Sequence, residues 1–281
     1  MGRLSERRRK QALFWCVISM AVTVGIAAYT LLLSWREPGR ETVGSTPESM
    51  GSVESTQVPE SEKFLRIDPI EVEGLDPELP IIALTVDDSV TAMTTDYCRV
   101  LQDNGCTATF FTVGYLAEKN PDTLMALAAA GMEIGNHTYS HQQLVGLSEE
   151  KISRQVTSAD QLIEKLTGKI PAVMRPPYGR VNRDVVMAAE HPVILWSLDA
   201  RDAISTSSEE ILAQLLLATD GDIVRIHDGV GATLEALEQG LPSLREAGIQ
   251  VTTVSNLFAV RGYAMESGRR YSRIPSDSEG A

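Results

Sequence analysis

The sequence predicts an α/β domain built on a parallel sheet, and three observations lead to this prediction. Strand-like and helix-like runs alternate along residues 81–254, giving about seven β/α units. The strand-like runs are short and apolar without clean alternation, which is typical of parallel strands buried on both faces. Polar residues suited to catalysis follow several of these runs. Because the order shows no reversal, a barrel, closed or incomplete, is favoured over an open doubly wound sheet.

The elements follow one another in a regular order. Strands are expected at 81–86, 108–113, 132–135, 172–174, 193–198, 223–226 and 250–254. Helices are expected at 94–104, 120–131, 148–168, 182–190, 208–219 and 231–247, with an irregularity at Gly240 and Pro242. Asn120 before Pro121, Ser148 and Ser208 suit helix N-caps.

The first 35 residues differ from the rest of the chain. Residues 1–10 are basic and predict a cytoplasmic segment. Residues 11–35 contain no charged side chain, and about 20 apolar residues suffice to cross a bilayer as a helix. We therefore expect a single-pass membrane anchor with the catalytic part outside the cell. The alternative is a secreted protein whose signal peptide is cleaved near Ala27-Ala28, although its apolar region would normally span only about 7–15 residues.

The remaining boundaries follow from composition. Residues 36–63 are rich in Glu, Ser, Thr, Pro and Gly and predict a disordered linker. The globular domain is expected at 64–263. Residues 264–281 are again polar and predict a flexible tail.

Charge and cysteine content restrict the possible partners. The formal net charge is −13, and the first 35 residues carry +4, so the remainder carries −17. Such an acidic body argues against nucleic acid as a partner. Cys98 and Cys106 are read as two small buried hydrophobic residues. A local disulfide in an oxidising compartment is the alternative.

Two adjacent acids, Asp87 and Asp88, end the first expected strand. Adjacent carboxylates at the end of a buried strand are costly unless a metal ion, an arginine or a shared proton compensates them. Taken alone, the pair is slightly more typical of a solvated loop or a helix N-cap than of a functional site. The residues that follow the other strands favour a functional site.

Polar residues cluster at the expected carboxyl ends of the strands, where β/α barrels build their active sites. His137 and His141 follow the third strand, Arg175 to Gly179 the fourth, Asp199 and Asp202 the fifth, and His227 and Asp228 the sixth. Three of the four histidines thus fall at these positions. Two imidazoles and one carboxylate suit zinc and similar divalent ions and leave positions open for water and substrate. His191 lies at the opposite end of a strand and is assigned a structural role.

These segments together resemble a known family. The set Thr85-Val-Asp-Asp88, His137-Thr-Tyr-Ser-His141, Arg175-Pro-Pro-Tyr-Gly179, Asp199-Ala-Arg-Asp202 and Ile226-His-Asp228 is similar to the five motifs of the NodB-type polysaccharide deacetylases, carbohydrate esterase family 4. Ala108-Thr-Phe-Phe-Thr-Val-Gly114 also resembles the second strand of that family. The resemblance covers about residues 80–258 and implies a distorted (β/α)7 barrel.

The resemblance also implies a metal site and a base. Asp88, His137 and His141 would bind one divalent metal ion, zinc first, with cobalt, nickel or manganese as alternatives. Asp87 would be the general base that takes a proton from water. Arg175 would orient Asp87 through charge pairing.

The same resemblance implies the remaining catalytic roles. The backbone amide of Tyr178 would stabilise the oxyanion. His227 would be the general acid that protonates the leaving amine. Asp199 would orient His227 and raise its pKa.

The sequence departs from the family pattern at three positions. Val86 and Ser89 replace the usual Phe and Gly of the first motif, and Ala203 replaces a common Trp after the fourth. The Trp ring helps to form an apolar pocket for the acetyl methyl group, beside which Ile226 replaces a common Leu. Because all the polar catalytic positions are present, an active enzyme with an altered pocket is favoured over an inactive protein.

The predicted function is removal of N-acetyl groups from a cell-surface polysaccharide by a monomeric, metal-dependent hydrolase. A domain anchored outside the membrane faces the cell wall, so peptidoglycan N-acetylglucosamine is the first expected substrate and N-acetylmuramic acid the next. Chitin oligomers or O-acetyl xylan are alternatives with the same catalytic set. A membrane-anchored glycan-binding protein without activity is the alternative of a different class.

Overall fold

A computed structural model describes residues 66–67 and 72–274 of the 281-residue chain. The cytoplasmic segment, anchor and linker expected at residues 1–63 lie outside the described residues, as do residues 275–281. None of the helices in the described part of the chain has the length and apolar character needed to cross a bilayer.

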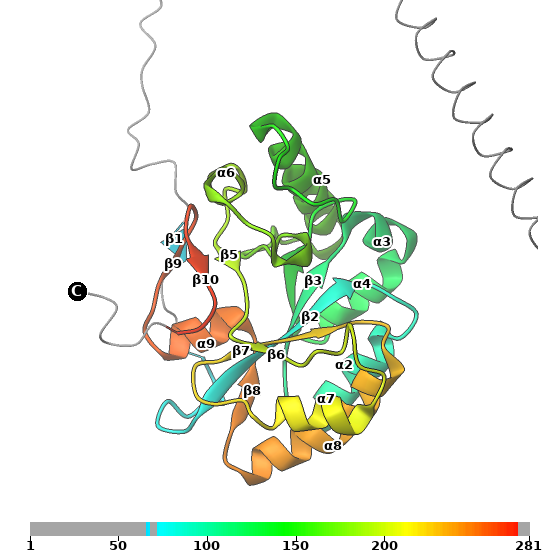
Figure 1. Ribbon diagram of the computed structural model, residues 1–281, viewed down its shortest axis with the longest axis vertical. Helices are drawn as coiled ribbons and strands as arrows, with labels where there is room; N and C mark the ends of the chain where they lie inside the picture. The colour runs from blue at the N-terminus through cyan, green and yellow to red at the C-terminus, as the bar shows by residue number, and fades with distance from the viewer. Residues whose placement is uncertain (1–65, 68–71, 275–281) are drawn as a thin grey trace, which may run out of the picture. The chain divides into compact units, whose positions relative to one another are not determined.

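The described part is an α/β domain around a parallel sheet, as the sequence predicts (Figure 1). The sheet contains β2 (Ile81–Ser89), β3 (Thr109–Thr112), β4 (Glu133–Asn136), β6 (Leu198–Asp199), β7 (Ile223–His227) and β8 (Gln250–Thr252), all paired in parallel. The central strand β2 pairs with β7 along one edge, and with β8 and then β3 along the other. Its residues are buried on both faces except Asp88, which explains its continuous apolar run.

The pairing continues beyond β4. Asn136 bridges Met174, and Met174 bridges Val193 in the short strand β5 (Val193–Ile194). The chain then passes through residues 195–197 into β6, which pairs with β7. The strands therefore follow one another around a ring, with an irregular passage between β5 and β6.

This passage divides the strand expected at 193–198. The backbone N–H of Leu195 donates to the carbonyl of Tyr271 at 2.7 Å, whereas that of Ser197 donates to Ile223 at 3.0 Å. Neighbouring residues thus bond to different partners, and no single ladder forms. The structure therefore contains the predicted succession of β/α units, but not seven regular ones.

A belt of helices surrounds the sheet (Figure 1). It comprises α2 (Thr94–Asp103), α3 (Gly114–Lys119), α4 (Pro121–Ala129), α5 (Glu149–Thr167), α6 (Arg183–Ala188), α7 (Ser208–Leu215), α8 (Gly231–Glu246) and α9 (Val254–Val260). The neighbouring pairs in the belt are α7 with α8, α8 with α2, α2 with α4, α4 with α5 and α5 with α6. Apolar side chains of α2, α4, α7 and α8 pack on β2, β3 and β7 and form the main core.

Most expected helices are present, with local differences. The N-cap of α7 is Ser207 rather than Ser208, because the Ser207 side chain accepts a hydrogen bond from the N–H of Glu210 at 3.3 Å. Helix α8 continues through Pro242 to Glu246, so the expected irregularity does not end it. Helices α3 and α9 were not predicted.

The segment after residue 263 is not loose throughout. Strand β9 (Met265–Glu266) pairs antiparallel with β1 (Arg66–Ile67), and β10 (Arg270–Tyr271) pairs in parallel with β5. The prediction of a flexible tail was therefore wrong for these residues. Their polar composition concealed strands whose stability comes from pairing with distant segments.

Cys98 and Cys106 are free thiols, in agreement with the preferred interpretation of the sequence. Cys98 is buried on α2, and Cys106 packs at the edge of the same apolar core. Burial raises the pKa of the Cys106 thiol to about 11, which keeps it protonated near neutral pH.

Candidate active site

Six of the eight predicted site residues line one cavity of about 510 Å³ at the carboxyl ends of the strands, whereas Arg175 and Asp199 do not line it. Strand β2 supplies two acids, the turn after β4 supplies two histidines, and β7 supplies the third. The lining residues are Asp87, Asp88, His137, His141, Tyr178, Ala203, Arg225, His227, Asp228 and Val230. Ring closure therefore brings together residues up to 143 positions apart in the sequence (87 to 230).

Asp88, His137 and His141 form a compact ligand cluster. One ligand atom of each lies within 4.8 Å of the others. Oδ1 of Asp88 is 3.0 Å from Nε2 of His141 and 3.5 Å from Nε2 of His137. The three residues that the sequence predicts as metal ligands are thus brought together.

Local backbone geometry aims these ligands. Nδ1 of His137 lies 2.7 Å from the carbonyl oxygen of Arg175, which leaves Nε2 facing the cluster. Asp88 and His141 have φ angles of 62° and 55°, and Thr138 between them in the chain has 66°. Such left-handed angles are unfavourable for residues other than glycine, and they persist where the surrounding structure imposes them.

The cluster fits a divalent cation. Oδ1 of Asp88 is buried and has no hydrogen-bond donor among the described residues. Two imidazole nitrogens and one carboxylate oxygen are the ligands that zinc and similar ions take in hydrolytic sites. A bound cation would satisfy the unpaired oxygen.

Asp87 is held by an arginine that is itself fully enclosed. Nη1 of Arg175 donates to Oδ1 of Asp87 at 2.7 Å and to Oγ1 of Thr85 at 2.8 Å. Its Nε and Nη2 donate to the carbonyls of Ile194 and Leu195 at 3.0 and 2.8 Å. Asp87 and Arg175 are only 3% and 0% exposed, so the pair is rigid and little screened. The predicted contact between them is present.

His227 is oriented by Asp202. Nδ1 of His227 lies 2.7 Å from Oδ1 of Asp202, and the backbone N–H of His227 donates to Oδ2 at 2.6 Å. The hydroxyl of Thr233 donates to the same Oδ2 at 3.0 Å. Burial lowers the pKa of His227, but the hydrogen bond and charge of Asp202 outweigh it and hold the pKa above its usual value.

The prediction that Asp199 orients His227 was therefore wrong. Asp199 on β6 stands in register with Arg225 on β7, and the two side chains form an ion pair at 2.6 Å. The turn that follows has Arg201 at a φ of 59° and carries Asp202 to the imidazole. Both acids follow the same strand, so the sequence alone did not distinguish them.

Tyr178 lies in a 3₁₀ turn (η2, Pro177–Gly179) at the edge of the cavity. Its φ is 62°, and its side chain is 60% exposed. The turn packs closely on an indole, because a Cβ added at Gly179 would lie 2.3 Å from the Trp196 ring. Within the described residues, the backbone N–H of Tyr178 donates to no backbone carbonyl and is free to bind a ligand oxygen.

Asp228, next to the general-acid candidate, ties two strand ends together. Its backbone N–H donates to the carbonyl of Asp87 at 2.9 Å. Its carboxylate accepts from the N–H and hydroxyl of Thr91 at 3.2 and 2.8 Å and from the hydroxyl of Thr94. Burial raises the pKa of Asp228. The sequence placed Asp228 in a motif but gave it no role.

Tyr97 was missed because a tyrosine within a helical pattern is typical of a core. Its hydroxyl donates to the carbonyls of His227 and Val230 at 3.1 and 2.7 Å. Helix α2 thereby supports the backbone that carries the imidazole.

Of the three departures from the family pattern, only Ala203 lines the cavity. Val86 is 0% exposed within the core, and Ser89 is buried at the end of β2. The departures at these two positions therefore do not alter the wall of the cavity. The departure at Ala203 does alter the wall, because a methyl group stands where the family commonly has the ring of a Trp.

His191 has the structural role that the sequence predicts. Its Nδ1 lies 2.7 Å from the carbonyl oxygen of Ala189, and its Nε2 lies 3.5 Å from Asp160. The imidazole is buried away from the cavity.

Comparison with known proteins gives a consistent result. Residues 75–192 match the family model described as "Polysaccharide deacetylase". The peptidoglycan-N-acetylmuramic acid deacetylase PdaC of Bacillus subtilis is 33% identical over 191 residues, covering 67% of this chain and 41% of that protein. A peptidoglycan-N-acetylglucosamine deacetylase of Bacillus cereus is 34% identical over 187 residues, covering 63% of this chain and 87% of that protein.

The fold is similar to solved structures as well. The structure of PdaC from Bacillus subtilis superposes with a TM-score of 0.64 at 33% identity, covering 66% of this chain and 94% of that chain. The chain spans only 41% of the length of the first two curated relatives. The family match at residues 75–192 includes Asp87, Asp88, His137, His141 and Tyr178 of the cavity.

Proposed function

Because the chain belongs to the polysaccharide deacetylase family, we propose that it is a metal-dependent hydrolase that removes N-acetyl groups from peptidoglycan. The observation that carries the proposal is the convergence of Asp88, His137 and His141 within 4.8 Å, in the same cavity as Asp87 and His227. This arrangement combines a cation site, a base and an acid, which amide hydrolysis requires.

The cation would be held by Asp88, His137 and His141. When bound, it would supply Lewis-acid polarisation of the acyl oxygen and make water more acidic. Zinc suits two imidazoles and one carboxylate best, and cobalt, nickel or manganese are alternatives.

Asp87 acts as the general base that accepts a proton from the attacking water. Its carboxylate lies beside the ligand cluster, and Arg175 fixes it at 2.7 Å. Arg175 donates to Asp87 with a fully buried guanidinium whose three nitrogens all donate hydrogen bonds, so the carboxylate is pre-organised before substrate binds.

His227 acts as the general acid. Nδ1 of His227 is engaged by the carboxylate of Asp202. Nε2 of the same ring is therefore the nitrogen that delivers a proton to the leaving amine. The raised pKa keeps more of the imidazole protonated near neutral pH. The N–H of Tyr178 at the cavity edge stabilises the negative charge that develops on the acyl oxygen when water adds to the acyl carbon.

Peptidoglycan as the substrate is supported by the names of curated relatives, which specify N-acetylmuramic acid in one case and N-acetylglucosamine in others. We further propose that residues 11–35 anchor the domain at the outer face of the cell membrane, with secretion after cleavage as the alternative. Chitin oligomers and O-acetyl xylan are the alternative substrates. A glycan-binding protein without turnover is less well supported, because the cavity holds the three ligand candidates, the base Asp87 and the acid His227 together.

The direct test uses the full-length chain in detergent. Bound metal is determined, and acetate release is measured from peptidoglycan, from N-acetylglucosamine oligomers and from O-acetyl xylan, before and after chelation. We expect acetate from peptidoglycan that stops on metal removal and returns on metal addition. Bound metal without acetate from any of these glycans would contradict the proposal.

A further inference from the structure

Arg225 occupies a position in the cavity that none of the catalytic roles requires. It lies on β7 two residues before His227, and its side chain is 13% exposed. It is the only arginine among the ten residues that line the cavity, and it shares the wall with Ala203. The base with its arginine and the acid with its aspartate are both complete without it.

The guanidinium of Arg225 is fixed in place. Nη2 donates to Oδ2 of Asp199 at 2.6 Å, and Cζ lies 3.7 Å from the centre of the Trp196 ring. An ion pair on one edge and an indole on one face define both the position and the plane of the group. A donor fixed in this way loses little conformational freedom when a ligand binds.

Part of the guanidinium lacks an acceptor. Among the described residues, Asp199 at Nη2 is the one acceptor that Arg225 has, so Nη1 has none. Nε is buried and also without a partner. Nη1 is therefore the nitrogen that a ligand in the cavity can pair by supplying oxygen acceptors.

The charge of Arg225 also acts against the general acid. It lowers the pKa of His227, whereas Asp202 and Asp87 raise it. A cation in this wall therefore disfavours the protonated imidazole that the leaving group needs. An anionic group on the substrate would offset that effect during the reaction.

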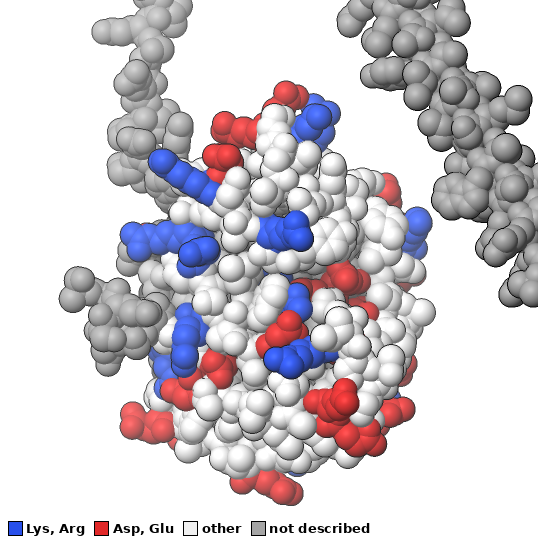
Figure 2. Space-filling view, in the orientation of Figure 1, with Lys and Arg blue, Asp and Glu red and all other residues white. Residues whose placement is uncertain are grey.

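The wider surface is compatible with an acidic ligand. The chain has a net charge of −13, yet Figure 2 shows several Lys and Arg side chains beside β9 and β10 and around α6, where Asp and Glu side chains lie among them. Arg183 and Arg270 from these elements line a separate cavity of about 350 Å³.

We propose that Arg225 binds a carboxylate that the glycan carries beside the scissile acetamide, so that acidic N-acetylated glycans are the preferred substrates. The inference rests on the proposed deacetylase function and specifies its substrate class. A fixed guanidinium suits a carboxylate because two N–H groups match its two oxygens. In peptidoglycan the carboxylate belongs either to the lactyl ether of a muramic residue or to the attached peptide.

The test compares substrates within each protein variant, so that a partly unfolded preparation does not distort the result. Full-length metal-loaded protein is given three glycans: peptide-free strands with the lactyl carboxylate, the same strands with this group reduced to the alcohol, and strands that retain the peptide. Acetate release gives kcat/KM for each. Mass spectrometry identifies which sugar has lost its acetyl group.

We expect the wild-type protein to prefer the carboxylate strands over the reduced strands by about 10-fold or more, as for a charge-assisted hydrogen bond. Arg225→Met should bring this ratio close to one, and Arg225→Lys should retain part of it. A preference limited to peptide-bearing strands would assign the carboxylate to the peptide instead of the lactyl group.

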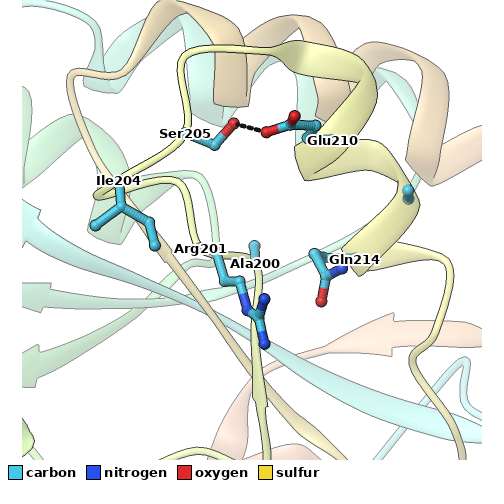
Figure 3. Close-up of a pocket in the computed structure, with 7 residues that line it drawn as sticks. Ala200, Arg201, Ile204, Ser205, Glu210 and Gln214 are labelled. Atoms are coloured by element: carbon cyan, nitrogen blue, oxygen red, sulfur yellow. Dashed lines mark hydrogen bonds between the residues drawn. The ribbon is translucent and has the colours of Figure 1, made fainter.

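Arg201 provides a matched control. It lies two residues after Asp199 and lines a separate cavity of about 410 Å³ with Ala200, Ile204 and Gln214 (Figure 3). Arg201→Met removes a nearby positive charge outside the candidate site and should leave the substrate ratio unchanged.

Two results would overturn the inference while leaving the deacetylase proposal intact. One is a wild-type kcat/KM that is about equal for all three glycans. The other is a ratio that persists in Arg225→Met or disappears in Arg201→Met. If the wild-type protein releases acetate from none of the three glycans and from no N-acetylglucosamine oligomer, that result instead contradicts the deacetylase proposal.

Discussion

His227 and Asp202 are joined by two contacts: Nδ1 lies 2.7 Å from Oδ1, and the backbone N–H donates to Oδ2 at 2.6 Å. The carboxylate of Asp202 thus fixes both the imidazole ring and the backbone of His227. Because both contacts come from one residue, rotation of the ring and movement of the strand end are restricted together.

Asp202→Asn should lower acetate release and move the alkaline limb of the pH–rate profile to lower pH. The raised pKa of His227 depends on the charge of Asp202, so removal of that charge lowers the pKa and the imidazole loses its proton earlier as pH rises. The pH dependence of kcat measures the effect. Asp199→Asn is the control, and an equal shift in that variant would show that Asp199 acts on His227 after all.

Asp87→Asn should retain the metal and reduce kcat by about 10²- to 10⁴-fold, because only the base is removed. Metal content by mass spectrometry and acetate release measure the two properties separately. Loss of the metal would assign Asp87 to the ligands.

Asp88→Ala should lose both the metal and turnover. Asp88 supplies the single carboxylate of the cluster, and ligand loss weakens binding of divalent cations strongly. Asp96→Ala, which removes a carboxylate that is 51% exposed on α2, is the matched control and should keep both properties. Full activity in Asp88→Ala would contradict the assignment of the site.

Gly179→Ala should destabilise the fold by about 1–3 kcal/mol and reduce turnover. The added Cβ would lie 2.3 Å from the Trp196 ring at a φ of 63°, so the turn with Tyr178 has to move. Gly168→Ala controls for the backbone angle, because Gly168 has a φ of 77° and its Cβ would contact nothing within 4 Å. Chemical denaturation and acetate release of the two variants separate the clash from the backbone strain.

His191→Gln should flatten the dependence of stability on pH above about pH 6.5. Burial lowers the pKa of His191, but the hydrogen bond and charge of Asp160 raise it above its usual value. A raised folded-state pKa contributes stability that is complete below the unfolded value and is lost as pH rises through the folded value. The wild-type free energy of unfolding should therefore fall more between about pH 6 and pH 8 than that of the variant. Equal slopes would contradict this account.

The class of the fold and most of its elements were predictable, because strands buried on both faces and well-capped helices have local signatures. Helix α5 from Glu149 to Thr167 ends at Gly168 in the left-handed conformation, as the sequence predicts. Helices α3 and α9 have only 6 and 7 residues and too little periodicity to be recognised.

The candidate site was predictable in its residue types but not in all its pairings. Each acid or histidine followed a strand, which sufficed to collect them at one end of the sheet. The choice between Asp199 and Asp202 depended on the register of β6 against β7, which pairs Asp199 with Arg225. Arg225 had no signal in the sequence beyond being a charged residue within a strand. Its contact with Trp196 arises only when the strands close into a ring.

The strand β10 determines where the chain can be shortened without harm. Its residue Tyr271 accepts a hydrogen bond from Leu195, whose carbonyl accepts one from Arg175, the partner of Asp87. A recombinant domain that stopped at residue 263 would remove the first member of this series and uncover the edge of β5. Crystallisation and assay versions of the domain should therefore extend through Ile274, even though the family motifs end more than forty residues earlier, at Asp228.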